Sequence, residues 1–112
     1  IHRQYADAIE DIEGLSLAGV PDYAGNNHWM NILQINSAVY GENRELLMNR
    51  LEENGMQTRP VWVLNHMQKS YQNYQTYRIE KAKQLVTKSL CLLSSTNLSK
   101  KDIQKMIKHL NG

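Results

Sequence analysis

Short apolar segments with the two-residue periodicity of strands alternate with segments of helical periodicity along this chain. A chain of 112 residues, 41% of them hydrophobic, has room for one domain built around one core. We therefore expect residues 1–112 to form a single α+β domain in which a sheet of two or three strands packs against helices. The strand-like segments are residues 29–36, 56–64 and 89–95, and the helical ones are residues 1–14, 43–54, 76–88 and a last helix that begins at Ser99.

Two of the expected helices carry end signals. Gly55 suits the left-handed position that follows the helix over residues 43–54. Ser99 can cap the last helix, and Asp102 three residues later is the partner that a capping box requires. Between them, Pro60 has no N–H to give to a sheet, so it predicts an edge strand or a bulge.

Composition limits the kinds of partner that the chain can have. Lys and Arg total 13 against 11 Asp and Glu, and the formal charge of +2 is too weak to indicate nucleic acid or an anionic membrane, so we expect neither. Cys91, the one cysteine, lies in the apolar run SLCLL and indicates a core residue in a reducing compartment, which predicts a cytoplasmic location. The histidines lie at no metal-ligand spacing, so no metal site is expected.

The segment TRPVW is the first candidate for binding. Pro60 forces Arg59 into an extended conformation, from which its guanidinium can face a phosphate or a carboxylate. Trp62 offers a flat face to a ring. Strand alternation, however, places Arg59 and Trp62 on opposite faces, so both can contact one small ligand only if the strand twists or bulges. The alternative is an ordinary buried edge strand.

Two further segments leave a binding interpretation and a structural one open. In GNNHWMN, the side chains of Asn27, His28 and Trp29 can be held out for a ligand where a loop becomes a strand. The same asparagines can instead satisfy their own backbone in a turn. The lysines of the last helix can likewise face an anionic partner, or form a solvated face with cations near the helix C-terminus.

Three long segments carry a family resemblance: NNHWMNILQI, LLMNRLEENGMQTRPVWVLNHMQKSYQNY and AKQLVTKSLCLLSSTNLSKKDIQKMIKHL. In this order they resemble the C-terminal part of the DegT/DnrJ/EryC1/StrS family of pyridoxal-phosphate-dependent sugar aminotransferases. The most specific parts are the glycine-ended helix before TRP.W, the following H.Q..Y, and LCL.SS near the end. NHWMN and TRPVW resemble most the members that act on nucleotide-linked amino sugars of the bacillosamine and legionaminic type.

The resemblance implies a domain of a larger enzyme. The chain has no initiator methionine and opens inside a helical pattern, so we expect it to be a C-terminal fragment. The parent would be a cytoplasmic homodimer that moves an amino group from glutamate to a nucleotide-linked keto sugar. Its large domain, which would carry pyridoxal phosphate on a lysine, is absent, so we expect no catalytic residue here.

The family motifs match this chain at a few positions that the resemblance assigns to the substrate side. Arg59 would donate a charged hydrogen bond and His66 would contact the sugar, while the other positions would complete the wall. The matching positions are Asn27, His28, Arg59, Trp62, His66 and Tyr71, with Trp29 beside them.

A second hypothesis needs no parent enzyme. A free-standing module could bind a protein or a nucleic acid through the strand edge at Pro60 or through the basic last helix. For the enzyme fragment, we also expect an apolar face that once contacted the large domain and that now drives self-association.

Overall fold

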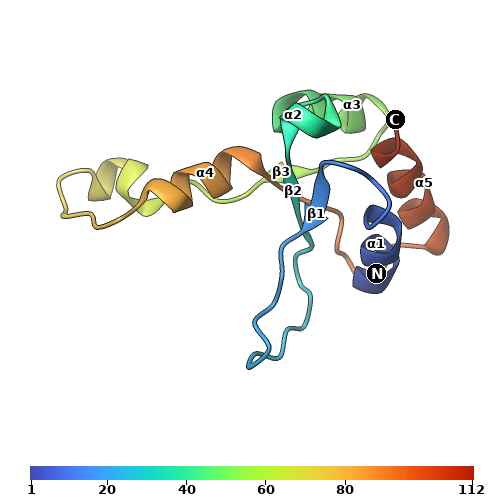
Figure 1. Ribbon diagram of the computed structural model, residues 1–112, viewed down its shortest axis with the longest axis horizontal. Coiled ribbons are helices and arrows are strands. Elements are labelled where there is room, and N and C mark those ends of the chain that lie inside the picture. The colour runs from blue at the N-terminus through green and yellow to red at the C-terminus, as the bar shows by residue number, and fades with distance from the viewer.

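The computed structural model describes residues 1–112, in which short helices lie beside a small sheet (Figure 1). The helices are α1 (His2–Ile9), α2 (Ser37–Tyr40), α3 (Arg44–Glu53), α4 (Glu80–Lys88) and α5 (Lys100–Leu110). The strands are β1 (Leu15–Leu17), β2 (Ile32–Ile35), β3 (Arg59–Pro60) and β4 (Ser89–Cys91), and two 3₁₀ turns cover Asn65–Met67 and Lys69–Tyr71. None of these helices is long and apolar enough to cross a bilayer.

The sheet has four antiparallel strands in the order β1-β2-β4-β3. The α+β class is confirmed, whereas the predicted two or three strands become four. The additional strand is β1, whose three residues pair with β2 from Leu15 opposite Ile35 to Leu17 opposite Leu33. Three residues are too few to display a periodicity, so only the pairing partner reveals this strand. Pro60 lies in β3 at one edge of the sheet, as its missing N–H predicts.

One core holds α1, α3 and α5 against the sheet. Its fully buried side chains come from all of these elements: Tyr5, Leu33, Leu47, Leu51, Leu90, Met106 and Leu110. The expected end signals operate as predicted. Gly55 has φ 75° after α3, and at the start of α5 the Asp102 N–H donates to Ser99 Oγ while the Ser99 N–H donates to Asp102 Oδ2, at 3.2 Å and 2.8 Å.

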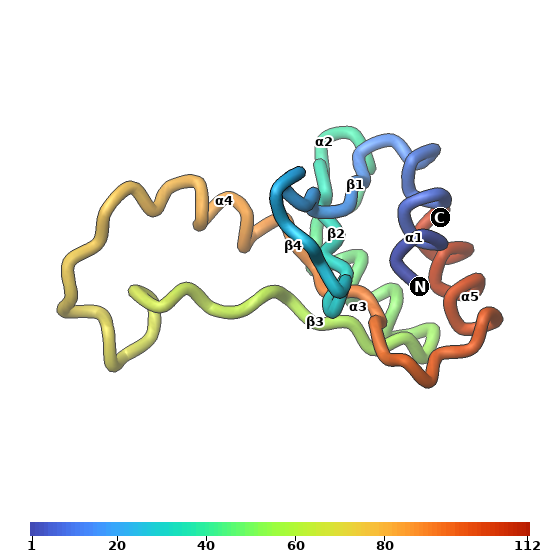
Figure 2. Tube along the Cα trace, turned by 90° about the horizontal axis from the view of Figure 1, so that it is seen from below, coloured from blue at the N-terminus to red at the C-terminus, as the bar shows by residue number.

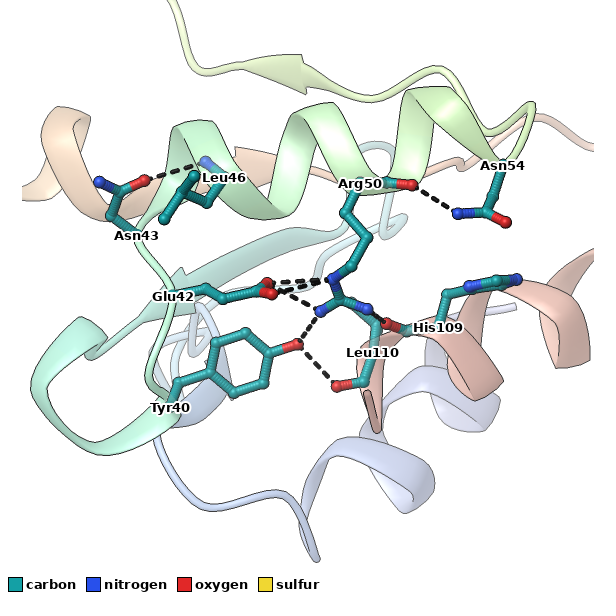
Figure 3. A network of polar contacts seen from close by, with 8 residues as sticks. All are labelled: Tyr40, Glu42, Asn43, Leu46, Arg50, Asn54, His109 and Leu110. Carbon is teal, nitrogen blue, oxygen red and sulfur yellow. Dashed lines mark hydrogen bonds and ion pairs between the residues drawn. The ribbon is translucent and has the colours of Figure 1, made fainter.

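A polar network centred on Arg50 fastens the end of α5 to α3 and α2 (Figure 3). The Arg50 guanidinium donates to the carboxylate of Glu42 at 2.8 Å, to the hydroxyl of Tyr40 at 2.9 Å and to the carbonyl of His109. The Tyr40 hydroxyl donates in turn to the carbonyl of Leu110 at 2.7 Å. These donors satisfy carbonyls in the last turn of α5 that have no partner within the helix.

Residues 61–88 form an arm that projects away from the rest of the molecule (Figures 1 and 2). The predicted strand over residues 56–64 is reduced to Arg59–Pro60, and the predicted helix over residues 76–88 begins only at Glu80. The later start follows from Arg78, whose φ of 48° cannot belong to a right-handed helix. The side chains expected to face inward from α4 are half-buried, and none is fully buried: Ile79, Ala82, Leu85 and Val86.

Candidate functional site

An open hollow of about 570 Å³ lies where the arm leaves the sheet. We call it the tryptophan hollow, because two exposed indoles belong to it. Its lining comes from the loop before β2, from β3 and the start of the arm, and from β4: Trp29, Met30, Arg59, Pro60, Val61, Trp62, Val63 and Cys91. The pairing of Arg59 opposite Cys91 in the sheet fixes one side of it.

Arg59 and Trp62 line this hollow together, although strand alternation predicted opposite faces. The exception stated for a strand that departs from regular geometry applies, because β3 ends at Pro60 and the period-two alternation does not extend to Trp62. Trp62 is 66% exposed and Trp29, which faces the same hollow, is 69% exposed. A guanidinium beside two accessible indole faces can hold a planar ring next to an anionic group.

The chemistry available in the tryptophan hollow is binding chemistry. Arg59 and Cys91 are its only ionisable side chains, and an arginine side chain does not act as a base near neutral pH. Burial raises the pKa of the Cys91 thiol, as its apolar surroundings predicted, so the thiol stays protonated near neutral pH. The lining therefore contains no general base and no activated nucleophile.

Asn27 and His28 lie next to the tryptophan hollow in a second one of about 430 Å³, to which Trp29 also contributes. Here the asparagines satisfy the backbone: Asn26 Oδ1 accepts from the His28 N–H at 2.8 Å and Asn27 Oδ1 from the Trp29 N–H at 3.0 Å. These bonds support the turn interpretation, and they hold His28 at a left-handed φ of 54°. The His28 ring stacks on that of His2 at 3.7 Å.

The buried residue Asn31 also lines this second hollow, and the site prediction did not include it. Its Nδ2 donates to Ser94 Oγ at 3.0 Å, and its Oδ1 accepts from His2 Nδ1 at 2.7 Å. Strand alternation does place Asn31 on the same face as Leu33, so a polar residue at a buried position was the available signal. Asn31 thus joins the start of β2 to α1 and to the chain after β4.

His66 and Tyr71 lie apart from the other predicted site residues, on the arm. They share a hollow of about 310 Å³ with Tyr74 and Tyr77. The Nε2 atom of His66 is buried there without a hydrogen-bond partner in the chain. The six predicted site residues therefore lie in three separate hollows, two residues in each. Two of these hollows share Trp29 as a lining residue.

Almost the whole chain matches a known family, including the part that contributes Arg59 and Trp62. Residues 1–111 match the sequence profile of the DegT/DnrJ/EryC1/StrS aminotransferase family. The chain belongs to this family. Among curated proteins, no sequence matches it significantly.

Solved aminotransferases share the fold of this DegT/DnrJ/EryC1/StrS family chain. DesI, crystallised in the presence of its TDP-sugar product, is 25% identical with a TM-score of 0.86 over 98% of this chain and 28% of DesI. The aminotransferase TlmJ from Streptoalloteichus hindustanus is 18% identical with a TM-score of 0.82, over 98% of this chain and 29% of TlmJ. The sugar aminotransferase CalS13 from Micromonospora echinospora is 16% identical with a TM-score of 0.82, over 98% and 28%. The chain thus spans less than a third of the length of these relatives.

The structure contains no cluster of three or more His, Cys, Asp or Glu side chains that could hold a metal ion.

Proposed function

We propose that the tryptophan hollow is one wall of the substrate site of a sugar aminotransferase, which this domain helps to close. The parent enzyme would move an amino group from glutamate to a nucleotide-linked keto sugar. One observation carries the proposal: in a domain of this aminotransferase family, Arg59 and two exposed indoles line one open hollow. In that setting the guanidinium suits a phosphate of the nucleotide, and an indole suits a ring.

Further features of the parent belong to the same proposal. It would be a cytoplasmic homodimer, and its substrate would be a sugar of the bacillosamine or legionaminic branch, which NHWMN and TRPVW resemble. His66 and Tyr71, with Tyr74, would reach the sugar only if the arm folds over a substrate that extends from the tryptophan hollow. The unpartnered Nε2 of His66 supports a polar contact there.

Pyridoxal phosphate would supply the carrier of the amino group, but the residues of the tryptophan hollow and of the hollow that contains Asn31 do not fit it. A cofactor lysine must stand beside a phosphate cradle and a partner for the pyridine ring. No lysine lines the tryptophan hollow or the hollow that contains Asn31. We infer that the cofactor binds elsewhere in the parent, and that the 112-residue chain alone does not transaminate. Turnover of a keto sugar by this chain with added pyridoxal phosphate would contradict that inference.

The substrate-wall role is tested by Arg59→Ala in the full-length enzyme. Loss of a charge-assisted hydrogen bond worth about 1.5 kcal/mol or more predicts a rise in the apparent KM for the nucleotide sugar of roughly tenfold or more. The KM for glutamate should change little. Lys101→Ala, an exposed charge on α5 outside the hollow, is the matched control. Unchanged kinetics in Arg59→Ala would refute the assignment.

A further inference from the structure

Three neighbouring hollows share the side chain of Trp29. It lines the tryptophan hollow and the hollow that contains Asn31. It also lines a further hollow of about 310 Å³, to which Gln57, Arg59 and Ser94 contribute. The way in which this indole is held therefore affects any ligand that extends from one of these hollows into the next.

The backbone on both sides of Trp29 is strained. His28 before it has a φ of 54° and Met30 after it has a φ of 138°, both in the left-handed range that a Cβ disfavours. Such residues persist only where the surrounding contacts hold them in place. The side chains of Asn26 and Asn27 accept bonds from His28 and Trp29, and so hold the N-terminal side of the segment. Its C-terminal side needs a second anchor.

Asn31 is that anchor, and only 3% of it is exposed. Its backbone N–H donates to Ser94 Oγ at 2.9 Å, and its carbonyl accepts from the Leu92 N–H at 2.9 Å. Its side-chain Nδ2 donates to the same Ser94 oxygen at 3.0 Å and lies 3.5 Å from the His28 carbonyl. The Ser94 hydroxyl donates to the Leu92 carbonyl at 3.1 Å, so its oxygen can accept both bonds from Asn31.

His2 completes this buried cluster from α1. The amide nitrogen of Asn31 is directed at Ser94 and His28, so the amide oxygen faces His2 Nδ1 at 2.7 Å. Because an amide oxygen has no hydrogen to donate, Nδ1 carries the proton of this bond. The same imidazole stacks on the His28 ring, with centroids 3.7 Å apart and 15° between the planes. His2 thus contacts the strained segment on both sides of Trp29.

We propose that Asn31 and His2 are positioning residues, which hold the indole of Trp29 in place as the shared wall of these hollows. They act on substrate binding through Trp29, which would face a ring of the nucleotide-linked substrate. This effect on the substrate rests on the proposed function, whereas the effect on the indole does not. A purely structural role for Asn31 would instead weaken the whole fold and would not single out Trp29.

Fluorine NMR of the 112-residue chain labelled with fluorotryptophan tests the positioning. The chain has two tryptophans, and Trp62→Phe assigns their signals. Asn31→Ala should move the Trp29 signal towards its position in the urea-unfolded chain and leave the Trp62 signal in place. His2→Phe keeps a ring against His28 and loses only the donor to Asn31, so it should move the same signal in the same direction.

Asn36→Ala is the matched control for these spectra. Asn36 is exposed and its side chain makes no capping bond to α2, so its replacement should leave both tryptophan signals unchanged. A Trp29 signal that stays in place in both Asn31→Ala and His2→Phe would overturn the proposal. So would equal displacement of the two tryptophan signals, because Asn31 would then support the fold in general.

Kinetics of the full-length enzyme test whether Asn31 acts through Trp29. Trp29→Ala and Asn31→Ala should each raise the KM for the nucleotide sugar, by roughly two- to tenfold, with kcat almost unchanged. In the Trp29→Ala background, Asn31→Ala should raise KM no further, since the residue through which it acts is gone. An equal rise in both backgrounds would contradict the positioning role.

The same measurements separate this inference from the proposed function. If Arg59→Ala raises KM while Trp29→Ala and Asn31→Ala do not, the cluster has no substrate role and this inference fails alone. If Arg59→Ala leaves KM unchanged while Asn31→Ala moves the Trp29 signal, the proposed function fails and the positioning of the indole is supported.

Discussion

The body of the molecule and its arm differ in how many of their residues are buried. The body comprises residues 1–58 and 89–112, and residues 59–88 lead into the arm and form it. All 17 buried residues lie in the body, and the Arg50 network locks its last helix in place. The arm has helical turns and an amphipathic α4 but no buried residue. Because folding stability comes mostly from buried apolar surface, the body can stabilise itself and the arm depends on contacts outside it. Two of the three hollows that contain predicted site residues lie at the root of the arm and on the arm itself.

The largest effect should come from removing a core side chain of the body. Leu47→Ala in α3, whose side chain is fully buried, should lower the free energy of unfolding by about 2–5 kcal/mol through lost burial and a cavity. Its neighbour in the same helix, Leu46, is 55% exposed, so Leu46→Ala should change stability by no more than about 0.5 kcal/mol. Urea denaturation measures both, and equal effects would contradict the position of the core.

Breaking the polar network should cost less. Arg50→Ala leaves Glu42 and the last carbonyls of α5 without their charged donor, and should lower the free energy of unfolding by about 1.5–3 kcal/mol. Arg3→Ala, which removes an exposed arginine on α1, is the control and should have almost no effect. If the two variants unfold at the same urea concentration, the network does not anchor α5.

A smaller effect should appear only at high pH. Burial raises the pKa of Tyr5 to about 12, and its hydroxyl donates to the Leu93 carbonyl at 3.0 Å. A raised folded-state pKa gives stability that is fully present below the unfolded-state pKa of about 10, and that is lost as pH rises towards 12. Burial also raises the pKa of Tyr40, which adds to the same slope.

The melting temperature of the wild type should therefore fall more steeply between pH 10 and 12 than that of Tyr5→Phe. Tyr23→Phe, in a 93% exposed position, should keep the wild-type slope. A Tyr5→Phe variant with the wild-type slope would show that this hydroxyl ionises as freely in the folded as in the unfolded protein.

The same contrast between body and arm explains which parts of the structure were predictable. The capping box at Ser99 and the left-handed Gly55 are set by residues within a few positions, so the sequence specifies them locally. The strand β1 was missed, because its three residues become a strand only through pairing with β2. The length of β3 was overestimated, because the apolar residues after Pro60 continue a strand pattern without a strand to pair with.

For the candidate site, the residue types were predictable and their grouping was not. Arg59 and Trp62 meet in one hollow because the backbone leaves the strand between them. The partner of both, Trp29, comes from a loop 30 residues earlier in the chain, and periodicity cannot predict that proximity. Asn31 was visible as a polar residue on a buried face, but its bonds to His2 and Ser94 depend on the tertiary fold.

Hydrogen exchange of the 112-residue chain tests most directly whether the body stabilises itself while the arm does not. We predict slow exchange in α3, β4 and α5, where the buried side chains lie. Amides of the arm should exchange rapidly, because none of its residues is buried. An arm that is as protected as the body would contradict the account.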